Sequence, residues 1–217
     1  MTGSELKFYT PAEERINILS HACALLLSIG GLLALVTRAV HHGSTLHLVS
    51  SSVFALSLIA LFTASTAYHS ARDPALRARL RKVDHAAIYV LIAGTYTPFT
   101  LITLQGGAGW ALFAVIWGMA AFGIALKLFF TGRFNLASTL MYVVMGWLIV
   151  FFIKPLIASF PTAGLAWLLA GGIAYTLGAV LYSIPKLPYN HAAFHLCVVL
   201  GGLCHFIAVY IYVLPAA

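Results

Sequence analysis

Charged side chains are scarce in this sequence. Only 8% of its 217 residues are Asp, Glu, Lys or Arg, and 62% are hydrophobic, whereas a water-soluble domain carries about 25% charged residues. A soluble protein of this size exposes too much surface to hide so many apolar side chains. We therefore predict an integral membrane protein, in which lipid replaces water as the solvent.

Acidic residues and cysteines are the rarest of the reactive side chains. The chain has five Asp and Glu residues and three cysteines, Cys23, Cys197 and Cys204, which all fall in apolar stretches. We expect each cysteine to be a small buried hydrophobic residue rather than half of a disulfide or a metal ligand. A cleavable signal peptide is also not expected, because residues 1–15 are polar and acidic.

Long apolar runs, in contrast, are abundant. A helix needs about 20 apolar residues to cross the hydrocarbon core, and an open sheet cannot satisfy its backbone in lipid. The sequence therefore predicts an all-α membrane protein, a single seven-transmembrane helix bundle over residues 1–217. The predicted spans are Ile16–Val36, Leu46–Ala67, Asp84–Leu104, Trp110–Phe130, Leu136–Ile153, Ala163–Ser183 and His191–Val213.

The basic residues are unevenly divided between the two sides of these spans. Ten of the twelve Lys and Arg residues flank the N-terminal side, and only Arg38 and Lys154 flank the other. Because basic loops stay in the cytoplasm, we predict a cytoplasmic N-terminus and an outside C-terminus, in the cell (inner) membrane. This topology accounts for the net charge of +7, so no nucleic-acid partner is expected. The ten residues are Lys7, Arg15, Arg72, Arg77, Arg79, Arg81, Lys82, Lys127, Arg133 and Lys186.

The segment after the second span has a pattern of its own. Asp73 and Pro74 form a good N-cap and first-turn pair, and apolar residues then recur at helical spacing among basic ones as far as Val83. Two interpretations stay open. The segment is a short interfacial helix lying on anionic headgroups, a positive loop that only determines topology, or both at once.

Polar residues inside the predicted spans are the informative ones, because ionisable groups in membrane helices are costly and tend to mark function. Three clusters of them fall at the same predicted depth, near the cytoplasmic leaflet. Unrelated structural polar residues would not be expected to agree in depth. The clusters are Glu14, Asn17 and His21 in the first span, Ser65 and His69 in the second with Asp84 and His85 in the third, and His191 and His195 in the seventh.

The histidine spacing points to a metal ion. His191 and His195 are one helical turn apart, about 6 Å along the axis, so both can reach one ion. His69 would supply a third ligand and leave a fourth position for water, as in catalytic zinc sites. Asp84 would hydrogen-bond that water or hold a ligand histidine in the right tautomer.

The same residues also have structural interpretations. His191 begins a span and suits the interface, Ser65 can bond to a carbonyl of its own helix, and Glu14 and Asn17 can cap the first helix. His205 lies about 15 Å deeper than His195, so we expect it to make an interhelical hydrogen bond rather than to bind the same ion.

Taken in order, the polar fragments resemble the three-part signature of the hemolysin III family, which belongs to the progestin and adipoQ receptor superfamily. The strings around Tyr68 and from Ala93 to Phe99 are also similar to bacterial members, and the resemblance covers nearly the whole chain. The fragments are Glu14-x-x-Asn17-x-x-x-His21, Ser65-x-x-x-His69 followed by Asp84, and His191-x-x-x-His195.

The resemblance implies a seven-helix bundle with an inside N-terminus. It implies zinc held by His69, His191 and His195, with Asp84 acting through a bound water and Ser65 nearby. The superfamily is also similar to alkaline ceramidases, which implies hydrolysis of a lipid amide, whereas the family name comes from cell lysis.

The leading hypothesis is therefore a zinc-dependent hydrolase acting on a membrane lipid. Asp84 would serve as general base and then general acid, and Ser65 would help to stabilise the oxyanion. A pore, and a sensor of membrane state with structural zinc, are the alternatives. The residues expected to orient groups around the ligands are Glu14, Asn17, His21 and His85.

Overall fold

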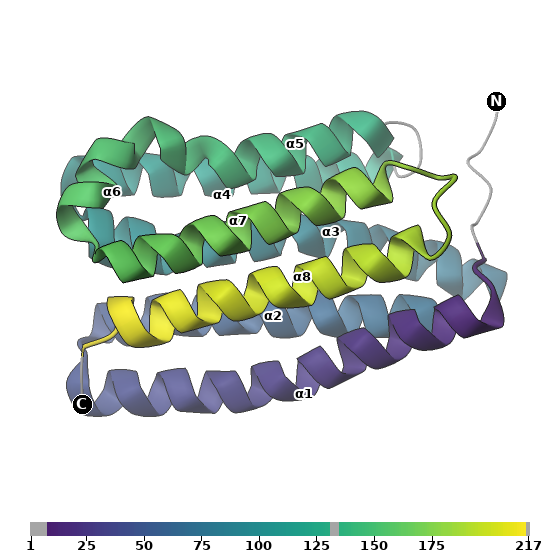
Figure 1. Cartoon of the computed structure of the whole chain (residues 1–217), viewed down its shortest axis with the longest axis horizontal. Coiled ribbons are helices and arrows are strands. Elements are labelled where there is room, and N and C mark those ends of the chain that lie inside the picture. The colour runs from purple at the N-terminus through teal and green to yellow at the C-terminus, as the bar shows by residue number, and fades with distance from the viewer. Residues whose placement is uncertain (1–7, 131–134, 216–217) are drawn as a thin grey trace.

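The computed structural model describes residues 8–130 and 135–215 of the chain. Throughout these residues the regular secondary structure is helical, and seven helices are long and apolar enough to cross a membrane (Figure 1). The predicted all-α, seven-helix fold is thus confirmed. Lys7 and Arg133, two of the basic residues used to predict the topology, lie outside the described residues.

The spans follow one another in an up-and-down bundle. The first, second, fourth and sixth are single α-helices, the third and seventh end in π-helical turns, and the fifth is interrupted by a 3₁₀ segment. The elements are α1 (Pro11–His42), α2 (Thr45–Ser70), α3 (Pro74–Pro98), η1 (Phe99–Leu104), α4 (Gly106–Phe130), α5 (Asn135–Trp147), η2 (Leu148–Phe152), α6 (Ile153–Ser159), α7 (Thr162–Tyr182), α8 (Asn190–Ile207) and η3 (Ala208–Val213).

Two helices begin at sequence-encoded caps. The Thr10 hydroxyl accepts a hydrogen bond from the Glu13 amide at 3.3 Å, just before a proline in the first turn of α1. Asp73 accepts from the Leu76 amide at 2.7 Å, and Pro74 opens α3. Such caps satisfy amides that have no partner within the helix. The prediction that Asp73 and Pro74 start a helix is confirmed.

The predicted boundary of the third span is wrong. α3 runs without a break from Pro74, so Asp84 lies well inside the helix and not at its first turn. No separate interfacial helix precedes it, because no proline or glycine interrupts the helical pattern between Pro74 and Asp84. Arg77, which we expected near the headgroups or in a loop, is buried in the bundle with 1% of its surface exposed.

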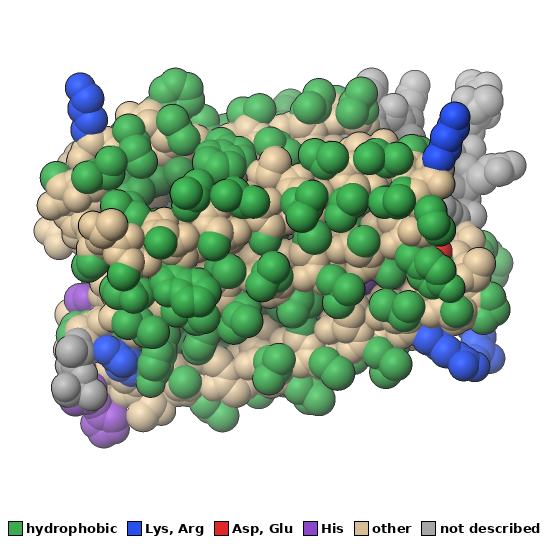
Figure 2. All heavy atoms as spheres, in the orientation of Figure 1, with side chains coloured by type: hydrophobic (Ala, Val, Ile, Leu, Met, Phe, Trp, Pro, Cys, Tyr) green, Lys and Arg blue, Asp and Glu red, His purple; other side chains and the backbone are tan. Residues whose placement is uncertain are grey.

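The outside of the bundle is apolar. Figure 2 shows hydrophobic side chains over the middle of the visible face and Lys and Arg side chains near its two ends. Leu26, Leu27 and Phe151, for example, are 71%, 74% and 83% exposed. A continuous apolar surface of this kind suits lipid and not water. Cys23 also lies on this surface, and Cys197 is half-buried, so of the three cysteines only Cys204 is buried as predicted.

The core lies between α1, α2, α3 and α8, with a second apolar cluster around Tyr89 between α3, α4 and α5. α1, α3 and α8 begin, and α2 ends, at the same end of the bundle (Figure 1). We call this the histidine end, defined by Glu14, His69 and His191. The fold thus brings together polar residues that are more than a hundred positions apart in the chain.

Candidate metal centre

Three imidazoles meet at the histidine end. Nε2 of His191 lies 3.0 Å from Nε2 of His69 and 3.1 Å from Nε2 of His195. One nitrogen from each ring can be chosen so that all three lie within 4.8 Å of one another, and all three residues are buried. The predicted ligand set is therefore brought together by the last turn of α2 and the first two turns of α8.

The opposite ring nitrogens of two of these residues are held by hydrogen bonds. Nδ1 of His69 lies 2.7 Å from Glu14 Oε2, and Nδ1 of His195 lies 3.3 Å from the backbone oxygen of Asn17. Carboxylate and carbonyl oxygens accept hydrogen bonds, so both Nδ1 atoms donate. In a neutral imidazole the other nitrogen then carries a lone pair, so Nε2 of His69 and of His195 point lone pairs at His191.

This arrangement fits a metal cation. Nε2 of His191 can donate one proton at most, so it cannot satisfy both neighbouring lone pairs. A cation among the three nitrogens would satisfy all of them. Zinc bound tetrahedrally at about 2.0–2.1 Å from each nitrogen places its ligands roughly 3.3 Å apart, close to the observed 3.0 and 3.1 Å. His69, His191 and His195 are thus the residues that could hold such an ion.

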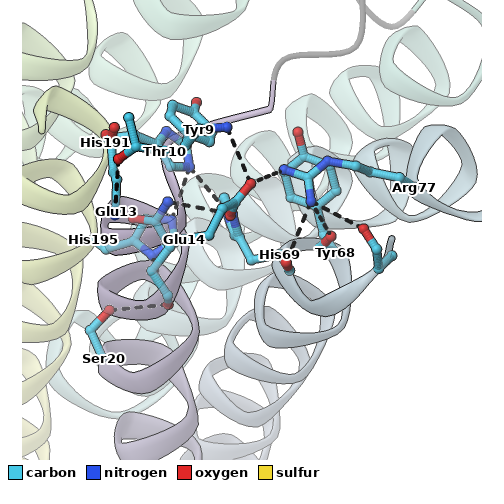
Figure 3. A network of polar contacts seen from close by, with 12 residues as sticks. Tyr9, Thr10, Glu13, Glu14, Ser20, Tyr68, His69, Arg77, His191 and His195 are labelled. Carbon is cyan, nitrogen blue, oxygen red and sulfur yellow. Dashed lines mark hydrogen bonds and ion pairs between the residues drawn. The ribbon is translucent and has the colours of Figure 1, made fainter. Parts of the chain in front are cut away.

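Glu14 is itself held in place by an arginine (Figure 3). Its Oε1 forms an ion pair with the guanidinium of Arg77, while its Oε2 accepts from His69. The same guanidinium donates to the backbone oxygens of Tyr68, His69 and Ala71 at 3.2–3.4 Å. These carbonyls lie at the C-terminal end of α2, where backbone oxygens run short of helical donors, although the Tyr68 oxygen also accepts from the Ala71 amide at 3.3 Å. Arg77 therefore closes α2 and positions the carboxylate that orients His69.

Aromatic rings stack on two of the candidate ligands. Tyr9 lies flat on His191 with ring centroids 4.7 Å apart, and His21 lies flat on His195 at 3.7 Å with an interplanar angle of 2°. Burial raises the pKa of the Tyr9 phenol well above its usual range, so the ring remains neutral beside the cluster. Both rings restrict how the ligand imidazoles can turn.

Asp84 and Ser65, the predicted catalytic pair, face a cavity of about 140 Å³ inside the bundle. His191 and His195 line the same cavity. The Ser65 hydroxyl is buried and interacts with the Asp84 carboxylate, so the two groups lie side by side at the cavity wall. His85 lines the cavity as well, and its Nδ1 is without a hydrogen-bond partner. Among the predicted orienting residues, Glu14, Asn17 and His21 contact the ligands directly.

The cavity continues deep into the bundle as far as His205. The expected interhelical hydrogen bond of this residue is not the one observed, because its Nδ1 bonds to the Gly201 oxygen of its own helix at 2.8 Å. Contact with another helix is instead a ring stack on Tyr175, with centroids 5.3 Å apart. His205 is thus remote from the three-histidine cluster, as predicted.

Sequence reasoning missed three residues at this end. Arg77 and Lys127 were assigned to the cytoplasmic side as topology-determining charges, yet both are buried, and Lys127 lines the cavity. Tyr9 was not singled out at all. A signal for Arg77 existed, because it stands seven residues before Asp84 and shares its helical face once α3 is read as continuous. No comparable signal marks Tyr9, whose contact depends on tertiary packing.

A seven-helix integral membrane protein with three converging imidazoles at one end of the bundle is the class that the fold and site define. The chain belongs to the hemolysin III family, because the family profile described as "Haemolysin-III related" matches residues 9–206. This confirms the resemblance inferred from the polar fragments.

The chain is similar to proteins from bacteria and mammals. It is 46% identical over 205 residues to "Hemolysin-3" of Bacillus cereus, covering 94% of each chain. It is 42% identical over 204 residues to "Hemolysin-3 homolog" of Bacillus subtilis (strain 168), covering 94% of this chain and 96% of the relative. It is 28% identical over 174 residues to "Monocyte to macrophage differentiation factor" of Homo sapiens, covering 76% of this chain and 70% of the relative.

Proposed function

We propose that this protein is a zinc-dependent hydrolase of a lipid amide, with its site at the cytoplasmic leaflet. The observation that carries the proposal is that His69, His191 and His195 converge on one point, and that two of them, His191 and His195, line the same cavity as Asp84 and Ser65. A purely structural metal site is commonly closed by a fourth protein ligand, whereas catalytic zinc sites have three and an open position.

Zinc supplies Lewis acidity at such a site, since it polarises carbonyl groups and makes water more acidic. The chain's own groups would move the proton. Asp84 would accept a proton from the attacking water as the C–O bond forms, and would return it to the amide nitrogen as the C–N bond breaks. Ser65 would donate a hydrogen bond to the oxyanion of the tetrahedral intermediate. The products are a carboxylic acid and an amine.

The cavity favours a lipid as the substrate. Its polar residues at the histidine end are followed by apolar side chains such as Leu61, Ile88 and Val198. An acyl chain would lie among these residues with the amide at Asp84. Basic residues flank the same end of the bundle, with Arg72, Arg79 and Lys82 exposed there, and basic flanks favour the cytoplasmic side.

Metal content tests the first step. Elemental mass spectrometry of the purified protein should find about one zinc per chain, and little in the His191→Ala, His195→Ala double variant. A His41→Ala, His42→Ala double variant is the matched control, because these two histidines are exposed at the end of α1, away from the cluster. Wild-type protein that stays metal-free after zinc is offered would rule out the hydrolase.

Turnover tests the second step. Zinc-loaded protein should release fatty acid from at least one member of a panel of long-chain amides and esters, and Asp84→Asn should abolish that release. If no member of the panel is hydrolysed by protein that carries zinc, the hydrolase proposal is wrong and the metal serves the structure or a sensor.

The names of the two bacillar relatives, "Hemolysin-3" and "Hemolysin-3 homolog", favour a pore as a second candidate. A pore requires a wetted path across both leaflets. Ion flux through the protein in liposomes that is lost in His195→Ala would support the pore. Vesicles that stay tight to ions, together with hydrolysis by the same preparation, would dismiss it.

A further inference from the structure

The deep end of the cavity carries a second group of polar side chains, far from the three-histidine cluster. His205 and Tyr175 both line it, and their rings stack with an interplanar angle of 18°. His205 follows His195 by ten residues of continuous helix, which separates them by about 15 Å along α8. Polar groups at such depth in a membrane protein are costly and tend to serve a function.

Two glycines make room for this pair. A Cβ atom at Gly171 would overlap the ring of His205, and a Cβ atom at Gly201 would lie 2.5 Å from Cε1 of Tyr175. Any side chain at either position would displace one of the two rings. Glycine at these two positions of α7 and α8 therefore leaves space for the rings of His205 and Tyr175, two polar side chains within an otherwise apolar part of the bundle.

The pair has unused hydrogen-bonding capacity. The buried Tyr175 hydroxyl has no partner, and Nδ1 of His205 already donates to the Gly201 oxygen, so Nε2 of the neutral ring is a lone-pair acceptor. Its neighbours differ in this respect, because Trp147 Nε1 donates to Thr176 Oγ1 at 2.9 Å, and that hydroxyl donates to the Gly172 oxygen. A buried polar group without a partner costs stability unless a ligand supplies one.

We propose that Tyr175 and His205 form a subsite for a hydroxyl group on the hydrocarbon chain of the ligand. Such a hydroxyl would accept from Tyr175 and donate to His205, and apolar residues such as Leu91 and Val198 would cover the chain between the two polar ends of the cavity. An extended carbon chain advances roughly 1.25 Å per bond, so the hydroxyl would stand about twelve bonds from the group at the histidine end. The subsite deepens the proposed function, on which it rests for the placement of the polar head.

Competition binding with three matched fatty acids tests the subsite. Tritiated stearate bound to the purified protein in detergent would be displaced by unlabelled stearate, 12-hydroxystearate or 2-hydroxystearate. We expect 12-hydroxystearate to bind about five- to a hundredfold more tightly than stearate, the range for two added hydrogen bonds. The 2-hydroxy isomer, whose hydroxyl cannot reach the deep end, should show no such preference.

Tyr175→Phe is the decisive variant, because it removes the hydroxyl and leaves the ring that stacks on His205. It should lower the preference for 12-hydroxystearate by about three- to tenfold, because one of its two hydrogen bonds is lost, and leave the affinity for stearate within about twofold of wild type. Tyr210→Phe is the matched control, since Tyr210 does not line the cavity. Equal affinities of the wild type for stearate and 12-hydroxystearate, or a preference that is unchanged in Tyr175→Phe, would overturn the subsite.

The outcome separates this inference from the hydrolase proposal. A Tyr175-dependent preference in a protein that holds no zinc and hydrolyses nothing would establish the subsite and reject the hydrolase. A protein that holds zinc and hydrolyses a lipid amide, but shows no preference for 12-hydroxystearate, would support the hydrolase and reject the subsite. Repeating the competition in the His191→Ala, His195→Ala variant, which lacks the cluster, should weaken all three acids but preserve their ratio.

Discussion

The carboxylate of Glu14 lies 2.7 Å from Nδ1 of His69, although the two residues belong to different helices and are 55 positions apart. The other oxygen of the same carboxylate pairs with Arg77 of a third helix. One acidic side chain therefore connects the starts of α1 and α3 with the end of α2. It also determines the tautomer of a candidate metal ligand.

Glu14→Gln should weaken metal binding. The amide oxygen accepts less strongly than a carboxylate, so Nδ1 of His69 is held less firmly and the basicity of Nε2 falls. Loss of such a partner typically costs 10- to 100-fold in metal affinity, roughly. Competition for zinc against a chelator of known affinity measures the change. Glu13→Gln is the control on the same turn of α1, and wild-type affinity in Glu14→Gln would contradict the role assigned to Glu14.

Arg77→Gln should lower stability. It leaves Glu14 without its cation and removes the donor to three carbonyl oxygens at the end of α2. Breaking a buried pair in this way costs on the order of 3 kcal/mol. Thermal unfolding in detergent measures this loss of stability. Arg79→Gln is the control, because Arg79 is exposed on the same helix. Equal unfolding temperatures for the two variants would show that Arg77 is not a structural centre of this end.

Asp84→Asn should separate chemistry from metal binding. The amide cannot take up a proton, so turnover should fall by about a hundredfold or more, while the zinc content should stay at the wild-type level because Asp84 is outside the three-histidine set. Elemental analysis and product release are measured on one preparation. Asp73→Asn, at the N-cap of α3, is the control. Loss of zinc in Asp84→Asn would instead make Asp84 a ligand.

Two glycines of α4 should respond in opposite ways to alanine. A Cβ atom at Gly123 would overlap the fully buried Tyr89 ring, whereas a Cβ atom at Gly118 meets nothing within 4 Å. Gly123→Ala should destabilise the protein by about 1–3 kcal/mol through overpacking, and Gly118→Ala should be neutral or slightly stabilising because alanine favours the helix. Thermal unfolding of both variants measures this. A similar loss of stability in both variants would contradict the packing of Gly123 against Tyr89.

The sequence was informative wherever a property depends on neighbours along the chain. Hydropathy over about 20 residues identified seven spans, and the Asp73–Pro74 pair correctly marked the start of a helix. Spacing of four residues placed His191 and His195 on one helical face. The sequence did not reveal that Arg77 and Lys127 are buried, because composition alone does not distinguish a cation at the headgroups from a cation inside the bundle.

The sequence by itself determined the solvent of this protein, the number of its membrane-spanning segments and the residue types of its candidate site, because these follow from local composition and helical periodicity. Only the tertiary structure decided which nitrogen of each imidazole faces the cluster, since that depends on Glu14 and Asn17 reaching His69 and His195 from another helix. The stacked His205 and Tyr175 rings likewise arise from packing between α7 and α8, and the cavity is lined by residues from these and several other helices. Contacts between different helices depend on how the helices pack, and the spacing of residues along the sequence does not reveal this packing.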